Sequence, residues 1–154
     1  MGWNPRTDDP DLRLGGFSLW VNGRQFPDLN DYWDGNWLRV EALVKADGAR
    51  VRATGPIIHS PELLAFADQL IALDQNPTGS ASLKCMEPEL DIEITVSKLG
   101  KASMIVSITP DHLKQQHRFE FELDQTYFRP AIASLERILS TYPIKDREMA
   151  VQPI

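Results

Sequence analysis

Residues that would mark a redox or metal site are scarce in this sequence of 154 residues. The only cysteine, Cys85, excludes an internal disulfide, and one cysteine with three histidines offers no recognisable zinc ligand set. Its apolar neighbours Leu83 and Met86 favour an inert, buried thiol over a reactive nucleophile. A chain without disulfides fits a reducing compartment.

Basic residues are also few. The sequence has 16 Lys and Arg against 22 Asp and Glu, which gives a formal net charge of −6. A nucleic-acid-binding protein needs a basic surface to neutralise phosphates, so this balance argues against nucleic acid as a partner. Negative charge does suit a basic protein partner, because complementary charge speeds encounter and orients docking.

Long apolar runs are missing as well. A membrane-spanning helix needs roughly 20 consecutive apolar residues, and the apolar runs here are far shorter. The N-terminus has no apolar signal core, and Arg6 stands where a myristoylation motif requires Ser or Thr. We therefore expect a cytoplasmic protein with no membrane partner.

Motifs of catalysis and cofactor binding are absent from the sequence: it has no P-loop, no GxGxxG and no GxSxG. The oxygen-bearing side chains from Asp28 to Asn36 have the composition of a calcium loop. An EF-hand, however, requires glycine at its sixth position, which is Trp33 when counted from Asp28. We expect no metal, cofactor or catalytic residue. A carboxylate pair formed by Asp34 and Glu87, as in glycosidases, stays open as a third-ranked, enzymatic hypothesis.

What the sequence does contain is hydrophobic alternation. Seven segments alternate apolar and polar residues, as half-buried strands do: residues 17–22, 38–45, 50–54, 81–85, 90–96, 104–108 and 117–123. Asn22-Gly23 and Asp47-Gly48 are typical of tight turns, since these residue types tolerate positive φ.

Two further segments have the helical period. The first begins with Ser60 as the predicted N-cap and Pro61 in the first helical position. The second begins near Arg129, after a short turn capped by Asp124, and ends before Pro143.

This arrangement predicts an α+β fold, because the helices are segregated from strands that follow one another through tight turns. We expect one antiparallel β-sheet of about six to seven strands with two main helices packed on one face. The predicted domain spans residues 17–144, between a flexible N-terminal arm (1–16) and a flexible C-terminal tail (145–154).

The most distinctive stretch is FPDLNDYWDGNWLRV, residues 26–40. It contains two of the four tryptophans, a tyrosine, three aspartates and two asparagines, and it leads into a predicted strand. Asp34-Gly35-Asn36 is interpreted as a turn whose side chains satisfy local backbone amides. Trp37 is expected in the core. For Trp33, beside Tyr32, a core position and an exposed interface anchor remain equal alternatives.

Four stretches together resemble the bacterial WapI-type immunity family, in the family's order. They cover nearly all of the chain after the N-terminal arm, and DYWDGNWL and DQTY are their most specific parts. The stretches are FPDLNDYWDGNWL (26–38), ELLAFADQLIAL (62–73), GSASLKCMEPEL (79–90) and FEFELDQTYFRPAIASLERILSTYPI (119–144).

The resemblance implies a protein that protects a cell from a toxin delivered by its neighbours, by binding the toxin and occluding its active surface. It implies no catalytic residue and no cofactor. The residues that carry the family pattern, which we interpret as mainly structural, are Asp31, Trp33, Asp34, Asn36, Trp37 and Asp124.

We therefore predict a non-enzymatic immunity protein that binds a basic toxin, with a nuclease as one candidate. An acidic surface would then mimic nucleic acid in the toxin's channel, with an aromatic anchor adding affinity. The predicted partner-binding residues belong to the loop or to the outward rows of two strands: Asp28, Asp31, Tyr32, Trp33, Asp34, Asp91, Glu93, Glu120 and Glu122. The alternative is a small-ligand-binding or regulatory module, with a pocket between the loop and the sheet.

Overall fold

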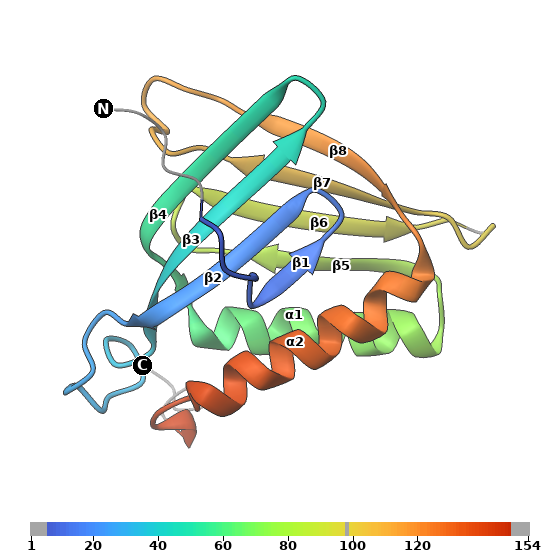
Figure 1. Ribbon diagram of the computed structural model, residues 1–154. Coiled ribbons are helices and arrows are strands. Elements are labelled where there is room, and N and C mark those ends of the chain that lie inside the picture. Colours follow the sequence, from blue (N-terminus) through green and yellow to red (C-terminus); the bar gives the residue numbers. More distant parts are fainter. Residues whose placement is uncertain (1–5, 98, 149–154) are drawn as a thin grey trace.

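Two antiparallel sheets and two helices make up residues 6–97 and 99–148, the part of the chain that the computed structural model describes (Figure 1). The first sheet contains β1 (Leu12–Leu14), β2 (Phe17–Arg24), β3 (Trp37–Ala46) and β4 (Ala49–His59), in that order. The second contains β5 (Gly79–Lys84), β6 (Leu90–Val96), β7 (Ala102–Ile108) and β8 (Arg118–Leu123), also in sequence order.

The predicted α+β class is confirmed, but the single sheet of six to seven strands is wrong. Each strand pairs with its neighbour in the sequence, and helix α1 (Ser60–Gln75) carries the chain from the first sheet to the second. Alternating hydrophobicity identifies a strand and its buried face, but it does not identify the strand's partner. The hydrophobic alternation of the sequence therefore did not reveal that the strands divide into two sheets.

The helices pack across both sheets rather than on one face of a single sheet. Helix α1 contacts β4 and β5, and α2 (Phe128–Thr141) contacts β1 and α1, so both helices lie on the side where the edge strands β1 and β5 end the sheets (Figure 1). Their apolar stripes join the inner faces of the sheets in one core. The side chain of Gln69 also accepts a 2.9 Å hydrogen bond from the backbone N–H of Ser82, which covers part of the free edge of β5.

The helix ends lie close to their predicted positions. The N-cap of α1 is His59, not Ser60, and its backbone N–H donates to the Glu62 carboxylate at 2.8 Å. Asp124 caps the short turn before α2 as predicted, since it accepts a 3.0 Å bond from the backbone of Thr126. A 3-10 turn (Gln125–Tyr127) follows, and Pro130 occupies the first turn of α2, where no N–H partner is needed.

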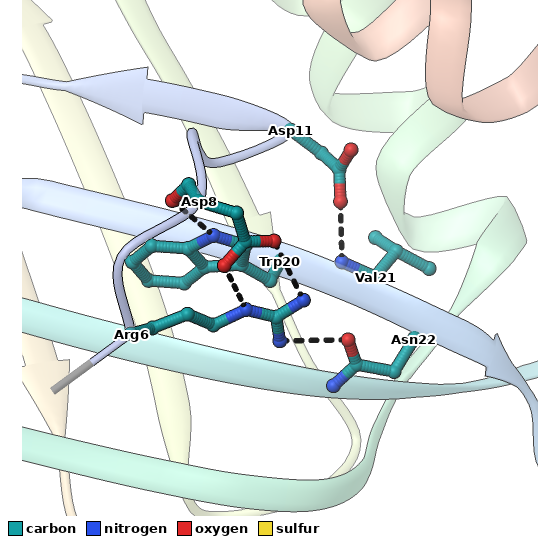
Figure 2. Close-up of polar contacts among 6 residues, drawn as sticks. All are labelled: Arg6, Asp8, Asp11, Trp20, Val21 and Asn22. Atoms are coloured by element: carbon teal, nitrogen blue, oxygen red, sulfur yellow. Dashed lines mark hydrogen bonds and ion pairs between the residues drawn. The ribbon is translucent and has the colours of Figure 1, made fainter. Parts of the chain in front are cut away.

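The segment predicted as a loose N-terminal arm lies against the first sheet (Figure 2). Arg6 pairs with the Asp8 carboxylate at 2.7 Å, donates to Oδ1 of Asn22 at 2.7 Å, and places its guanidinium 5.4 Å from the Trp20 ring centre. The indole N–H of Trp20 donates to the backbone carbonyl of Asp8 at 3.1 Å. These contacts leave Trp20 only 4% exposed, although the alternation of β2 assigns it to the outer face.

The end of the same segment is part of the sheet. Asp11 donates its backbone N–H to Leu19, accepts the N–H of Val21 on its carboxylate, and leads into β1. Leu12 and Leu14 of β1 are fully buried against the core. A strand of three residues is too short to give a recognisable alternation, so the sequence did not reveal it. Residues 1–5 and 149–154, at the ends of the predicted arm and tail, lie outside the described residues.

Candidate functional site

The aromatic–acidic loop, defined here as residues 26–36, connects β2 to β3 at the lower left of Figure 1. Its base is closed by a backbone hydrogen bond of 2.9 Å from Gln25 N–H to the Trp37 carbonyl. Inside the loop, Gly35 donates to the carbonyl of Asp31 at 3.1 Å, and Asp31 accepts the N–H of Asp34 on its carboxylate at 2.8 Å. The side chain that satisfies a local amide is therefore that of Asp31, which precedes the predicted Asp34-Gly35-Asn36 turn.

Asn36 fastens the loop to a segment more than a hundred residues away. Its buried side-chain amide donates to the carbonyl of Tyr32 at 2.8 Å and to that of Lys145 at 3.0 Å. Its oxygen accepts the backbone N–H of Lys145 at 2.8 Å. Because both ends of the amide are used, only asparagine or a close mimic satisfies these backbone groups together.

Two basic side chains complete this attachment. Arg24 donates to the carbonyls of Gly35 and Pro143 at 2.9 and 2.5 Å. The ammonium group of Lys145 donates to the carbonyls of Pro27 and Leu29 at 3.0 and 2.7 Å. The start of the predicted C-terminal tail is therefore a strap across the base of the loop.

The inner side of the loop is supported by His59, the last residue of β4, which is 2% exposed. Its Nε2 lies 3.0 Å from the carbonyl of Tyr32 and 3.1 Å from that of Trp33. The imidazole stacks on Trp33, with ring centres 5.8 Å apart and planes within 6°, and Tyr32 and Trp37 contact its other sides. Since carbonyls only accept hydrogen bonds, Nε2 carries the proton.

The burial of His59 has a consequence for pH dependence. Desolvation lowers its pKa below the ordinary 6.5, against the opposing effect of the two carbonyls. As the pH falls through 6.5, the unfolded chain takes up a proton that the folded chain binds more weakly, so the free energy of unfolding falls. The contribution is present above 6.5 and is lost as the pH drops towards the lower, folded-state pKa.

We expect His59→Gln, which keeps an N–H donor but does not titrate, to show a shallower loss of stability between about pH 7.5 and pH 5. Urea unfolding at several pH values measures this. An unchanged pH dependence in the variant would show that the His59 ring does not carry the effect.

The exposed residues of the loop include both apolar and acidic side chains. Trp33 is 53% exposed even though one face of its ring lies on His59, and Phe26 and Leu29 are 42% and 43% exposed. Of the alternatives for Trp33, the exposed one is therefore correct, whereas Trp37 is half-buried. Asp28, Asp31 and Asp34 are exposed as well, and the exposed residues of the loop together are called its outer side here.

The four other predicted residues lie on the outer face of the second sheet, on β6 and β8. Glu93 and Glu120 occupy one row across the sheet, on either side of Ile105 in β7. Glu122 lies one row further along, opposite Ser103. The sheet thus brings these three carboxylates near one another, on an element separate from the loop (Figure 1).

Asp91 has different surroundings from the other three acidic residues. Its row contains Lys84 on one side and, beyond Ser107, Arg118 on the other. Its carboxylate forms an ion pair with Lys84 at 3.7 Å. The outer face is therefore acidic in one part and charge-balanced in another.

The other candidate reactive groups are metal ligands and the Cys85 thiol. No group of three or more His, Cys, Asp or Glu side chains arranged to hold a metal occurs in residues 6–97 and 99–148. Burial raises the pKa of the Cys85 thiol above its usual range, and the neighbouring charge of Glu62 adds to this, so the reactive thiolate is disfavoured. A surface hollow of about 290 Å³ lies between the N-terminal segment and α2, with Asp11 and Tyr142 in its wall, rather than between the loop and the sheet.

Sequence reasoning missed several residues of this site. Phe26 and Leu29 had a detectable signal, because apolar side chains in a polar loop are unusual. His59, Arg24 and Lys145 had no local signal, since their partners are distant in the sequence and appear only in the folded chain.

Comparison with protein-family models matches residues 11–143 to the immunity protein WapI-like family. A search of curated proteins found no match. The matched region runs from the residue before β1 to the residues just after α2, and it includes both sheets, both helices and the aromatic–acidic loop. Within the described residues, no helix is long and apolar enough to span a membrane. The chain belongs to the WapI-like family of immunity proteins.

Proposed function

We propose that this protein is a non-enzymatic immunity protein that neutralises a cognate bacterial toxin by binding it and occluding its active surface. Membership of the WapI-like immunity family supports a toxin-neutralising role. The structural observation that carries the proposal furthest is the loop, which exposes Trp33 while His59 and Asn36 hold it from behind.

The electrostatics favour a basic toxin. The chain has a formal net charge of −6, and the exposed carboxylates of the loop and of the second sheet contribute to it. A toxin that degrades nucleic acid needs a basic channel, and an acidic protein would compete for that channel. A nuclease is accordingly the toxin class that this charge fits best.

The polar groups inside the loop support binding rather than chemistry. Asn36 has its amide engaged with backbone groups, one oxygen of the Asp31 carboxylate accepts a backbone N–H, and His59 Nε2 faces two carbonyls. Side chains that are hydrogen-bonded to the backbone in this way stabilise the conformation of the loop. A small-ligand module remains the second candidate, because the hollow of about 290 Å³ beside α2 offers a place for one.

The test is co-expression with the toxin encoded beside the gene, in a strain that the toxin alone arrests. We expect growth to be restored, and the two purified proteins to co-elute on gel filtration. An unrelated acidic protein of similar size is the control for charge alone. Absence of both rescue and a complex would contradict the proposal, and a thermal shift with a small molecule would then favour the second candidate.

A further inference from the structure

Large exposed apolar side chains concentrate in the aromatic–acidic loop. Phe26, Leu29 and Trp33 are 42%, 43% and 53% exposed, and they lie within eight residues of one another. The other large exposed apolar residues of the described chain occur one at a time, on four separate connections: Met86, Leu99, Leu113 and Tyr127. Single exposed apolar residues are ordinary, whereas several on one loop indicate a surface that becomes covered.

The loop is held in place before any partner arrives. Trp33 rests on the buried ring of His59, Asn36 bonds the loop to Lys145, and Lys145 bonds back to two loop carbonyls. Ordering a mobile loop on binding costs free energy, so a pre-ordered loop leaves more of its contact energy for affinity. Aromatic side chains with few rotamers suit this role and dominate measured interface energies.

The charge on the loop selects the partner. Asp28, Asp31 and Asp34 are exposed on it, while two cations that contact the loop, Arg24 and Lys145, donate to backbone carbonyls. The carboxylates are therefore available to basic side chains of a partner. A two-fold dimer through the same surface would bring like charges together, which disfavours a second copy of this chain as the occupant.

The outer face of the second sheet lacks such an anchor. Between Glu93 and Glu120 lies Ile105, which is half-buried, and Asp91 is paired with Lys84. No large apolar side chain of β6, β7 or β8 is exposed to the extent that Trp33 is. Exposed rim charges alone contribute little affinity because water and salt screen them.

We propose that the toxin contacts the outer side of the aromatic–acidic loop, with Trp33 as the anchor and the loop carboxylates facing a basic surface of the toxin. This assignment rests on the proposed immunity function and goes beyond it, because it selects one of two acidic surfaces. Phe26 and Leu29 extend the apolar contact, and the outer face of the second sheet stays outside the interface.

Isothermal titration with the purified toxin encoded beside the gene tests the assignment. Trp33→Ala is expected to raise Kd about 30-fold, the usual effect of removing an aromatic hot spot. The double substitution Asp28→Asn with Asp34→Asn is expected to raise Kd about tenfold and to make Kd less dependent on salt concentration. The matched pair Glu93→Gln with Glu120→Gln removes the same charge from the sheet and is expected to change Kd by less than about twofold.

The outcomes separate the two proposals. If the wild-type protein neither binds nor protects, the proposed function fails. If it binds and Trp33→Ala binds equally well, or the sheet pair weakens binding more than the loop pair, only the interface assignment fails. Phe26→Ser, which leaves the His59 stack intact, is a second variant in case Trp33→Ala alters the loop. It is expected to raise Kd about fivefold, and an unchanged Kd in Phe26→Ser also overturns the assignment.

Discussion

Asn36→Ala is expected to lower the free energy of unfolding by about 3 kcal/mol. The substitution leaves the carbonyls of Tyr32 and Lys145 and the N–H of Lys145 without the partners they have in the wild-type protein. Asn36 is fully buried, so water does not readily replace the lost amide. Because the loop and the strap after α2 meet at this side chain, both are expected to loosen together.

Urea unfolding followed by tryptophan fluorescence measures this loss. Asn22→Ala is the matched control, since Asn22 is exposed and accepts a hydrogen bond from Arg6; we expect a change within about 0.5 kcal/mol. Equal stability of the two variants would mean that Asn36 does not hold the loop. A loss of toxin binding that accompanies the Asn36 substitution would further link the strap to the interface.

Gly16→Ala is expected to cost about 2–3 kcal/mol of stability. A methyl group on Gly16 would lie 2.4 Å from the carbonyl oxygen of Lys45 and 2.4 Å from Cε1 of Phe121, far inside van der Waals contact. Gly16 also accepts a 2.9 Å hydrogen bond from the N–H of Lys45, which fixes its distance from that strand. The first sheet and β8 of the second sheet therefore approach one another where only glycine fits.

A double-mutant cycle with Phe121→Leu separates the two clashes. Leucine lacks the ring atoms that meet the new methyl, so the double variant is expected to be more stable than the sum of the single losses predicts. A Gly16→Ala protein that unfolds at the wild-type urea concentration would show that the sheets tolerate a wider separation at this point.

Local patterns predicted the elements of this fold well. The Asp47-Gly48 turn joins β3 to β4 as expected, with Gly48 at φ 77°, a conformation that glycine adopts without strain. The apolar spacing of both helices matches their buried faces. Propensity and periodicity act within a few residues, so they are readable without knowledge of the fold.

Local patterns misled where the sheet itself overrides them. Asn22-Gly23 is not a turn: Gly23 lies in β2 at φ 135°, where the pairing with β3 shifts register. Similarly, the alternation predicts that β4 ends at Thr54, but β4 continues to His59. Its pairing with β3 goes on past a register shift between Val40 and Leu38, so that Leu38 pairs with Ile58. Bulges accommodate glycine inside a strand, and a turn-forming pair alone does not distinguish the two cases.

The sequence by itself determined the α+β class, most element positions, and a loop in which aromatic and acidic residues gather. It also carried the family resemblance, which the family match over residues 11–143 confirmed. These properties depend on residue order and composition, which a linear chain displays in full.

Tertiary structure alone decided that the strands form two sheets, that Arg6 and Asp8 cover Trp20, and that His59 and Asn36 support the aromatic–acidic loop. Each of these depends on contacts between segments far apart in the sequence. The Asn36 amide reaches Lys145, and the His59 ring reaches Tyr32 and Trp33, only when distant segments of the chain are brought together by folding. That long-range support is what keeps Trp33 exposed in a fixed position.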